Sequence, residues 1–118
     1  MGKRKEKTAR ELSAYNFMWM IVMFDLPVGT REERRDASDF RNWLLDSGFE
    51  MSQYSVYMRF CVSKEDFSRR LNAVSAATPK RGRVHVLSVT DKQFERMTVF
   101  RGATRSRGRK PPGQLDLF

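Results

Sequence analysis

The sequence predicts an α+β fold, namely a ferredoxin-like βαββαβ sandwich with an antiparallel sheet, a short extra C-terminal edge strand and a homodimeric assembly. Stretches with strand character alternate along the chain with two stretches of helical spacing. Both helices would cover one face of the sheet and leave the other face free for a second copy. At 118 residues the chain is near single-domain size, and a dimer interface would help so small a body to stay folded.

The first strand and the first helix are marked by an apolar run and a capping box. Residues 17–24 (FMWMIVMF) are apolar at both parities, which is typical of a central strand covered on both faces. Thr30 and Glu33 have the spacing of a capping box, so a helix should begin there. Gly48 can take the left-handed conformation that ends a helix. The apolar residues at helical spacing between these points are Ala37, Phe40, Trp43 and Leu44.

Residues 49–62 are rich in aromatic and β-branched residues, which is strand material. The stretch is long for one strand, so a tight hairpin or a bend is expected near residues 53–55, although no Asn-Gly pair marks it. A second capping signal follows at residues 63–66 (SKED), and Pro79 lies just beyond the end of the second helix. Its expected buried residues are Phe67, Leu71 and Val74.

The last predicted strand covers residues 83–90 (RVHVLSVT), which alternate in polarity and include β-branched residues. A turn at residues 91–95 would lead to the short edge strand at residues 97–100. Three segments result: a basic flexible arm (1–16), a ferredoxin-like domain (17–101), and a basic linker with an apolar C-terminal docking tail (102–118).

The charge balance points to an anionic partner. There are 23 Lys and Arg residues against 14 acidic ones, a formal net charge of +9, so nucleic acid comes first and anionic lipid second. The single cysteine, Cys61, allows neither an internal disulfide nor a thiolate zinc site, which suits a reducing cytoplasm. The run at residues 17–24 is too short to cross a bilayer, and a turn follows it where a signal peptide would have a cleavage site. We therefore expect no membrane partner.

Asp25 is the best candidate for a catalytic and metal-binding residue. It ends the first predicted strand, just before a Pro/Gly turn, where a carboxylate can point at a ligand. The pattern alone favours an aspartate that organises the turn. One carboxylate is also a poor site for Mg²⁺, but a two-fold axis near Asp25 would bring two to one ion, which could activate water for attack on a phosphodiester.

Basic residues in three places are candidates for nucleic-acid contacts. The arginines of the first helix lie among acidic residues, which favours ion pairing within the helix for most of them. A second group flanks Gly82 in a loop without acidic neighbours in the sequence and resembles a phosphate-contacting patch, which Arg69 and Arg70 would extend. Basic residues after residue 100 either track a phosphate backbone or belong to a solvated linker. The candidates are Arg31, Arg35, Lys80, Arg81, Arg83, Arg101 and Arg105.

Other residues are expected to serve protein contacts or packing. Leu115, Leu117 and Phe118 alternate at the C-terminal end, so we interpret them as a strand that docks on a partner protein. His85 is interpreted as an ordinary strand residue without a chemical role, and Cys61 as a small packing residue.

Three segments together resemble the small CRISPR-associated endonuclease family: MIVMFDLPV, GTREERRDASDFRNWLLDSGF and MSQYSVY. In that family the first strand ends in Asp, and a later strand carries Gln-x-Ser-Val followed by an aromatic residue. Asp25 matches the first motif, and Gly48 matches the turn between helix and strand. The residues that match the second motif are Gln53, Ser55, Val56 and Tyr57. The resemblance spans most of residues 17–100.

The resemblance implies a ferredoxin-like homodimer with an Mg²⁺ site, alternatively an Mn²⁺ site, that uses the Asp25 of both chains. It further implies a place between two dimers of the CRISPR integrase, where the subunit holds protospacer duplex DNA during spacer acquisition in a prokaryotic cytoplasm. The family is credited with RNA or DNA cleavage, yet its part in acquisition is architectural, so enzyme status stays open. The alternatives are a stand-alone metal-dependent endoribonuclease or DNase and a single-stranded RNA-binding module, whose glycine-aromatic signature is absent.

Overall fold

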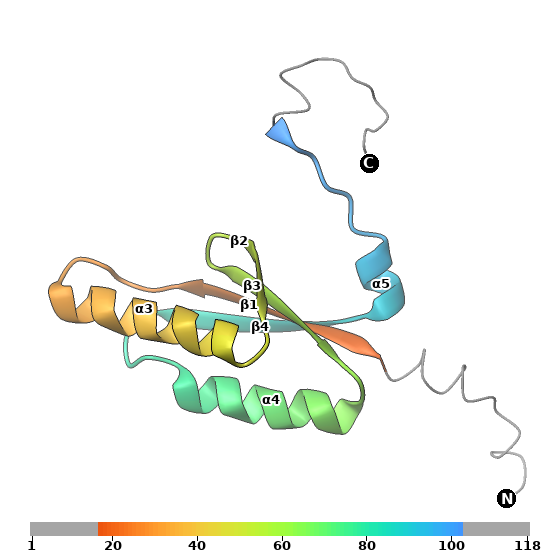
Figure 1. The fold of residues 1–118 in the computed structure, drawn as a ribbon, viewed down its shortest axis with the longest axis horizontal. Helices are drawn as coiled ribbons and strands as arrows, with labels where there is room; N and C mark the ends of the chain where they lie inside the picture. The colour runs from red at the N-terminus through yellow and green to blue at the C-terminus, as the bar shows by residue number, and fades with distance from the viewer. Residues whose placement is uncertain (1–16, 103–118) are drawn as a thin grey trace, which may run out of the picture.

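The structure is a computed structural model that describes residues 17–102. Its four strands form one antiparallel sheet in the order β2-β3-β1-β4, and α3 and α4 cover the same face (Figure 1). This arrangement confirms the predicted ferredoxin-like α+β fold. The elements are β1 (Met18–Asp25), α3 (Arg31–Asp46), β2 (Glu50–Gln53), β3 (Val56–Cys61), α4 (Lys64–Ala77), β4 (Arg83–Thr90) and α5 (Asp91–Glu95). The arm at residues 1–16 lies outside the described residues, as does nearly all of the tail segment.

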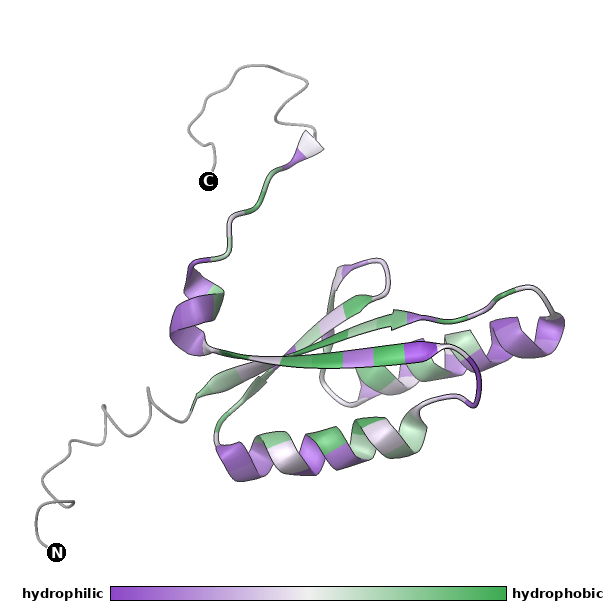
Figure 2. Cartoon of the chain, turned by 180° about the vertical axis from the view of Figure 1, so that it is seen from behind, coloured by the Kyte–Doolittle hydropathy of each residue, from purple (hydrophilic) through white to green (hydrophobic). Residues whose placement is uncertain are grey.

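The capping box at the start of α3 is confirmed. The Thr30 hydroxyl accepts a hydrogen bond from the Glu33 amide at 3.1 Å, and the Glu33 carboxylate accepts from the amides of Thr30 and Gly29 at 3.0 and 2.9 Å. These contacts satisfy amide groups that a helix start leaves without partners. The first turns of α3 are strongly hydrophilic (Figure 2). At the other end Gly48 has a φ of +89°, the left-handed conformation that the sequence predicts there.

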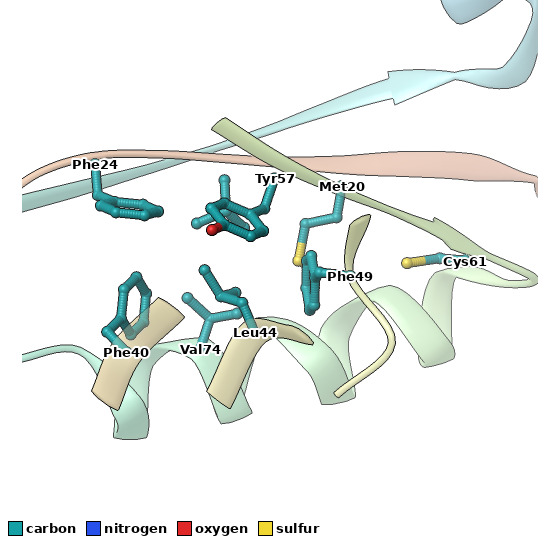
Figure 3. Packing of buried hydrophobic residues seen from close by; sticks show 9 residues of the cluster. Met20, Phe24, Phe40, Leu44, Phe49, Tyr57, Cys61 and Val74 are labelled. Carbon is teal, nitrogen blue, oxygen red and sulfur yellow. The ribbon is translucent and has the colours of Figure 1, made fainter. Parts of the chain in front are cut away.

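The core lies between the sheet and the two helices. Met20 and Phe24 point from β1 toward the helices, where they meet buried residues of α3 and α4 (Figure 3). Val22 lies between them in the strand and belongs to the same buried cluster. The Phe24 ring packs edge-on against Phe40 at 5.2 Å between centroids. Because successive side chains of a strand alternate, the other apolar parity of β1 lies on the open face of the sheet. The remaining members of the core are Leu44, Phe49, Tyr57, Cys61 and Val74.

The expected break in the second strand stretch is confirmed, and it lies between Gln53 and Val56. Ser55 has a φ of 70°, so it takes the left-handed conformation that an Asn-Gly turn would otherwise supply. A register shift between Met51 and Gln53 accompanies the turn. The chain therefore makes a tight hairpin without the usual sequence signal.

The second helix begins at its predicted cap, where the Ser63 hydroxyl accepts from the Asp66 amide at 3.0 Å. Val74 is buried and Phe67 packs against the core, as expected. The prediction for Leu71 is wrong, because this residue is 39% exposed. The buried side of α4 instead begins at Asp66 and includes Val74, and Leu71 lies at the rim of that side.

The segment after β4 differs from the prediction. The expected turn is the short helix α5, and no strand forms at Met97–Phe100 within the described residues. α5 is held against the sheet because the Trp19 indole donates a hydrogen bond to Asp91 at 2.9 Å and its ring stacks on Phe94. The chain that follows leads away from the sheet (Figure 1), so these residues do not pair with the free edge of β4. None of the helices within residues 17–102 is both long and apolar enough to cross a membrane.

Candidate functional site

Asp25 is the last residue of β1, and its side chain lies on the open face of the sheet. Its strand neighbour Phe24 points into the core, so alternation directs the Asp25 carboxylate away from the helices. Asp25 is exposed and makes no side-chain hydrogen bond or ion pair with another described residue. It borders an open depression of about 280 Å³, together with Met23, Phe24, Arg83 and His85. Both carboxylate oxygens are therefore available to a ligand.

The edge strand β4 brings two further polar side chains to this depression. Arg83 is the register partner of Asp25, and His85 is the partner of Met23. Directly opposed residues of an antiparallel pair share a face, with Cβ atoms about 5 Å apart. Arg83 and Asp25 nevertheless form no ion pair within 4.0 Å. His85 is a strand residue, as expected, and the fold places it in the depression beside Asp25.

The backbone around Asp25 is positioned by two turns that are distant in the sequence. The amide of Phe24 donates to the carbonyl of Ser55 at 3.1 Å, so the hairpin turn is tied to the end of β1. Gly82 has a φ of +94°, and a Cβ added to it would lie 2.7 Å from the Asp25 carbonyl oxygen. The fold therefore joins the motif that ends in Asp25 to the motif that contains Ser55.

The patch around Gly82 is less free of acidic groups than the sequence suggested. Arg81 lies 3.9 Å from Glu32 of α3, and both side chains are largely exposed. The expectation of no acidic neighbour is wrong for Arg81, because α3 packs beside this loop. Arg83 belongs to β4 and not to the loop, whereas Lys80 is an exposed loop residue. Lys80 and Arg83 have no ion pair with a described residue.

The predicted ion pairing within α3 is wrong for the arginines. Arg31 and Arg35 are exposed and pair with no acidic residue in the described part of the chain. Arg34 donates to the Val28 carbonyl at 3.2 Å, and the Arg41 guanidinium lies 5.4 Å from the centre of the Tyr54 ring. Exposed ion pairs on a helix contribute little free energy, so the sequence spacing that predicted these pairs is not enough to form them. Arg31 and Arg35 thus remain free for a polyanion.

Arg69 and Arg70 have a structural role that the sequence did not reveal. Both donate to Oδ1 of the buried Asp66, at 2.7 and 3.0 Å, and the Val62 amide donates to Oδ2 at 3.0 Å. Burial acts to raise the pKa of Asp66, but the Val62 hydrogen bond and the two arginine charges outweigh it and hold that pKa below its ordinary value. These arginines stabilise the start of α4, and nothing in their contacts supports the expected extension of the phosphate patch.

The remaining predicted site residues lie at or beyond the edge of the structure. Arg101 is exposed. Arg105 and the proposed docking residues Leu115, Leu117 and Phe118 lie outside the described residues, so their roles stay predictions.

One chain offers a metal ion at this site a single carboxylate, that of Asp25. Residues 17–102 contain no group of three or more His, Cys, Asp or Glu side chains that could hold an ion. Mg²⁺ prefers oxygen ligands and commonly keeps several waters, with only one or two carboxylates from the protein. The unengaged Asp25 carboxylate fits that requirement once a second copy supplies its own Asp25. The donor set is therefore compatible with Mg²⁺ or Mn²⁺ in a dimer.

Comparison with known proteins identifies the family. The family described as CRISPR associated protein Cas2 matches residues 18–97. A protein of Paracidovorax avenae named CRISPR-associated endoribonuclease Cas2 is 51% identical over 107 residues, which cover 91% of this chain and 99% of that protein. Proteins of the same name from Flavobacterium psychrophilum and Parvibaculum lavamentivorans are each 44% identical, covering 91% and 86% of this chain and 93% and 100% of their own lengths. The chain therefore belongs to the Cas2 family of CRISPR-associated proteins.

Proposed function

We propose that the chain acts in CRISPR spacer acquisition as a homodimer that bridges two integrase dimers and holds protospacer duplex DNA. We also propose a Mg²⁺-dependent endonuclease site formed by the Asp25 of both copies, in the cytoplasm of a prokaryote. The observation that carries the proposal is the unengaged Asp25 carboxylate at the rim of the apolar sheet face opposite α3 and α4, beside Arg83.

The open face of the sheet supports the dimer. It carries Ile21 and Met23 of β1, and Leu87 of β4 is 50% exposed there, whereas Trp19 at the far end of this face is stacked on Phe94 of α5. The side chains of β3 that continue this face are Val56, Met58 and Phe60. Burial of such a surface against an identical one is favourable by the hydrophobic effect. An isologous interface repeats each contact, so a two-fold axis near Asp25 would place two carboxylates at one ion.

Positive charge at the same end of the molecule supports the DNA contact. The end of β1, the start of α3 and the start of β4 meet there, as the pairing of Asp25 with Arg83 and the contact of Arg81 with Glu32 show. Exposed Arg and Lys side chains attract phosphates by charge, without reading base sequence. The contacts proposed at this end are Arg31, Arg35, Lys80 and Arg83. Arg101 would add a contact after α5, as would Arg105, which lies outside the described residues.

The chemistry at Asp25 follows from these side chains. A bound divalent ion supplies a polarised water and a charge partner for the phosphodiester. The Asp25 carboxylates would hold that ion, and Arg83 and His85 lie where they can contact phosphate oxygens. With a single acidic residue per chain at the site, we expect slow hydrolysis, since general acid-base catalysis usually adds 10²–10⁴-fold.

A stand-alone endoribonuclease is the second candidate. It is favoured by one observation, namely that the relatives with 44–51% identity bear the name endoribonuclease. In this case the same Asp25 pair would act on RNA without an integrase. The two functions therefore share one site and differ in the partner that the dimer needs.

Sedimentation velocity with the integrase and duplex DNA tests the main proposal. We would compare wild type with Asp25→Ala, with a chain lacking residues 114–118, and with Asp39→Ala, an exposed change on α3, as the control. We expect the complex to survive Asp25→Ala and to fail on truncation. A normal complex with the truncated chain would show that the tail does not dock.

A cleavage assay on the same proteins separates the two functions. Duplex DNA and single-stranded RNA are incubated with each variant, with and without Mg²⁺. We expect metal-dependent cleavage to disappear in Asp25→Ala and to persist in Asp39→Ala. Metal-dependent cleavage that survives Asp25→Ala would show that Asp25 does not hold the metal. Cleavage of RNA by a protein that forms no complex with the integrase would favour the second candidate.

A further inference from the structure

Arg83 occupies an unusual position for a residue beside a cation site. It faces Asp25 directly across the β1 and β4 pair, on the same open face, yet the two groups form no ion pair within 4.0 Å. Arg83 also makes no hydrogen bond with another described residue. Its guanidinium therefore forms no ion pair with Asp25 and is not held by any other residue between 17 and 102.

This position gives Arg83 opposite effects on the two proposed ligands. A divalent ion at Asp25 would lie close to a permanent positive charge, because guanidinium groups stay protonated in proteins. A phosphate bound beside that ion would instead be attracted by both the ion and Arg83. In the dimer two Arg83 side chains balance the two Asp25 carboxylates, so the empty site carries no excess negative charge to concentrate cations.

We propose that Arg83 couples metal binding to nucleic-acid binding. The guanidinium disfavours a divalent ion at Asp25 when no phosphate is present, and a bound phosphodiester removes that penalty. The inference rests on the proposed function, since it requires a metal at Asp25 and a phosphate beside it. Arg83 would position the phosphate and regulate metal occupancy. The net charge of the sequence does not indicate this role, because it depends on the pairing of Arg83 with Asp25 across the sheet.

Linkage makes the coupling reciprocal. If the nucleic acid raises the affinity for the ion by some factor, the ion raises the affinity for the nucleic acid by the same factor. If the ion and the Arg83 guanidinium lie about 6 Å apart, their repulsion in water weakens metal binding roughly tenfold for each guanidinium. Salt screens this repulsion, so the effect should be largest at low ionic strength.

The test measures Mn²⁺ binding without relying on cleavage. Electron paramagnetic resonance of free Mn²⁺ gives the affinity for the whole protein, with and without a saturating duplex DNA, in buffer of about 10 mM ionic strength. The variants are Arg83→Gln, Asp25→Ala and Lys92→Gln. Lys92→Gln is the matched control because it removes the same charge from α5, beyond the far end of β4.

For wild type we expect weak Mn²⁺ binding that strengthens when duplex DNA is added. Arg83→Gln removes one guanidinium charge from each copy, so it should bind Mn²⁺ roughly ten- to a hundredfold more tightly without DNA, with a smaller gain on adding DNA and weaker DNA binding. Lys92→Gln should behave as wild type toward Mn²⁺. Suppose that Asp25→Ala abolishes Mn²⁺ binding but Arg83→Gln binds Mn²⁺ no more tightly than wild type. That result would overturn the coupling and leave the metal site in place. Mn²⁺ binding that survives Asp25→Ala would overturn the metal site and the coupling with it.

Discussion

Replacing Gly82 with alanine tests how the end of β1 is positioned. A Cβ at this residue would lie 2.7 Å from the Asp25 carbonyl oxygen, 2.8 Å from Leu26 Cδ2 and 3.0 Å from Leu26 Cα. Two of these three atoms belong to the backbone and cannot move without moving the turn itself. The φ of +94° adds strain for any residue with a side chain.

The magnitude follows from these two contributions. A left-handed backbone costs a non-glycine residue about 1–2 kcal/mol, and forcing an extra carbon into packed surroundings costs about 1–3 kcal/mol. We therefore expect Gly82→Ala to lower the free energy of unfolding by roughly 3 kcal/mol. In a domain of this size each kcal/mol lowers Tm by about 4–8 °C, so the loss in Tm should exceed about 10 °C.

Two other glycines serve as matched controls. Gly48→Ala has a similar φ of +89°, but its added Cβ would meet only the side chain of Arg59, which can move aside. It should cost about 1–2 kcal/mol, mainly from backbone strain. Gly102→Ala would meet no atom within 4 Å and should leave Tm unchanged.

The assay is thermal unfolding followed by circular dichroism at one fixed protein concentration, because dimerisation makes Tm depend on concentration. Folded Gly82→Ala protein should also bind Mn²⁺ more weakly, since the turn that carries Asp25 has to shift. A Tm loss no larger than that of Gly48→Ala would refute the claim that the close approach of Gly82 to Asp25 positions the site.

Two further predictions concern the helix starts. Asp66→Asn should destabilise the fold by about 1–3 kcal/mol near neutral pH, because the Val62 amide and two arginines lose a charged acceptor. Since folding lowers the pKa of Asp66, its stabilisation is complete above the ordinary value of 3.8 and is lost as pH falls through the lower folded value. Urea unfolding from pH 7 to pH 2 should show this loss in wild type and not in Asp66→Asn, and equal acid sensitivity would contradict it. Thr30→Ala should lower the free energy of unfolding by about 1 kcal/mol, and Thr30→Ser, which keeps the hydroxyl, should lower it much less. Equal losses for the two variants in urea unfolding would rule out a cap made by the hydroxyl.

Local signals predicted the fold well. The capping residues Thr30 and Ser63 and the C-terminal Gly48 act within a few residues of their own positions, so a single sequence contains the information. Leu71 was misassigned because helical spacing alone does not say which of two adjacent positions faces the sheet. The strand expected at Met97–Phe100 has suitable residues, but the chain after α5 leads away from the unpaired edge of β4, and strand propensity does not report that path.

The candidate site was only half predictable from the sequence. Asp25 was found because it ends an apolar strand before a turn. The neighbourhood of Asp25 depends on the register of β4 on β1, which places Arg83 opposite Asp25 and His85 opposite Met23. That register joins residues that are far apart in the sequence. Alternation within β4 predicts which side chains share a face, but it does not predict which residue of β1 each of them lies opposite.

The hairpin residue Ser55 changes how its motif should be understood. Its hydroxyl makes no hydrogen bond with a described residue, whereas its carbonyl accepts from Phe24 and its backbone is left-handed. The Gln-x-Ser-Val pattern thus encodes a backbone shape more than a reactive group. Glycine or asparagine could fill this position and keep the shape, so a search for relatives that insists on serine would pass over proteins with the same site.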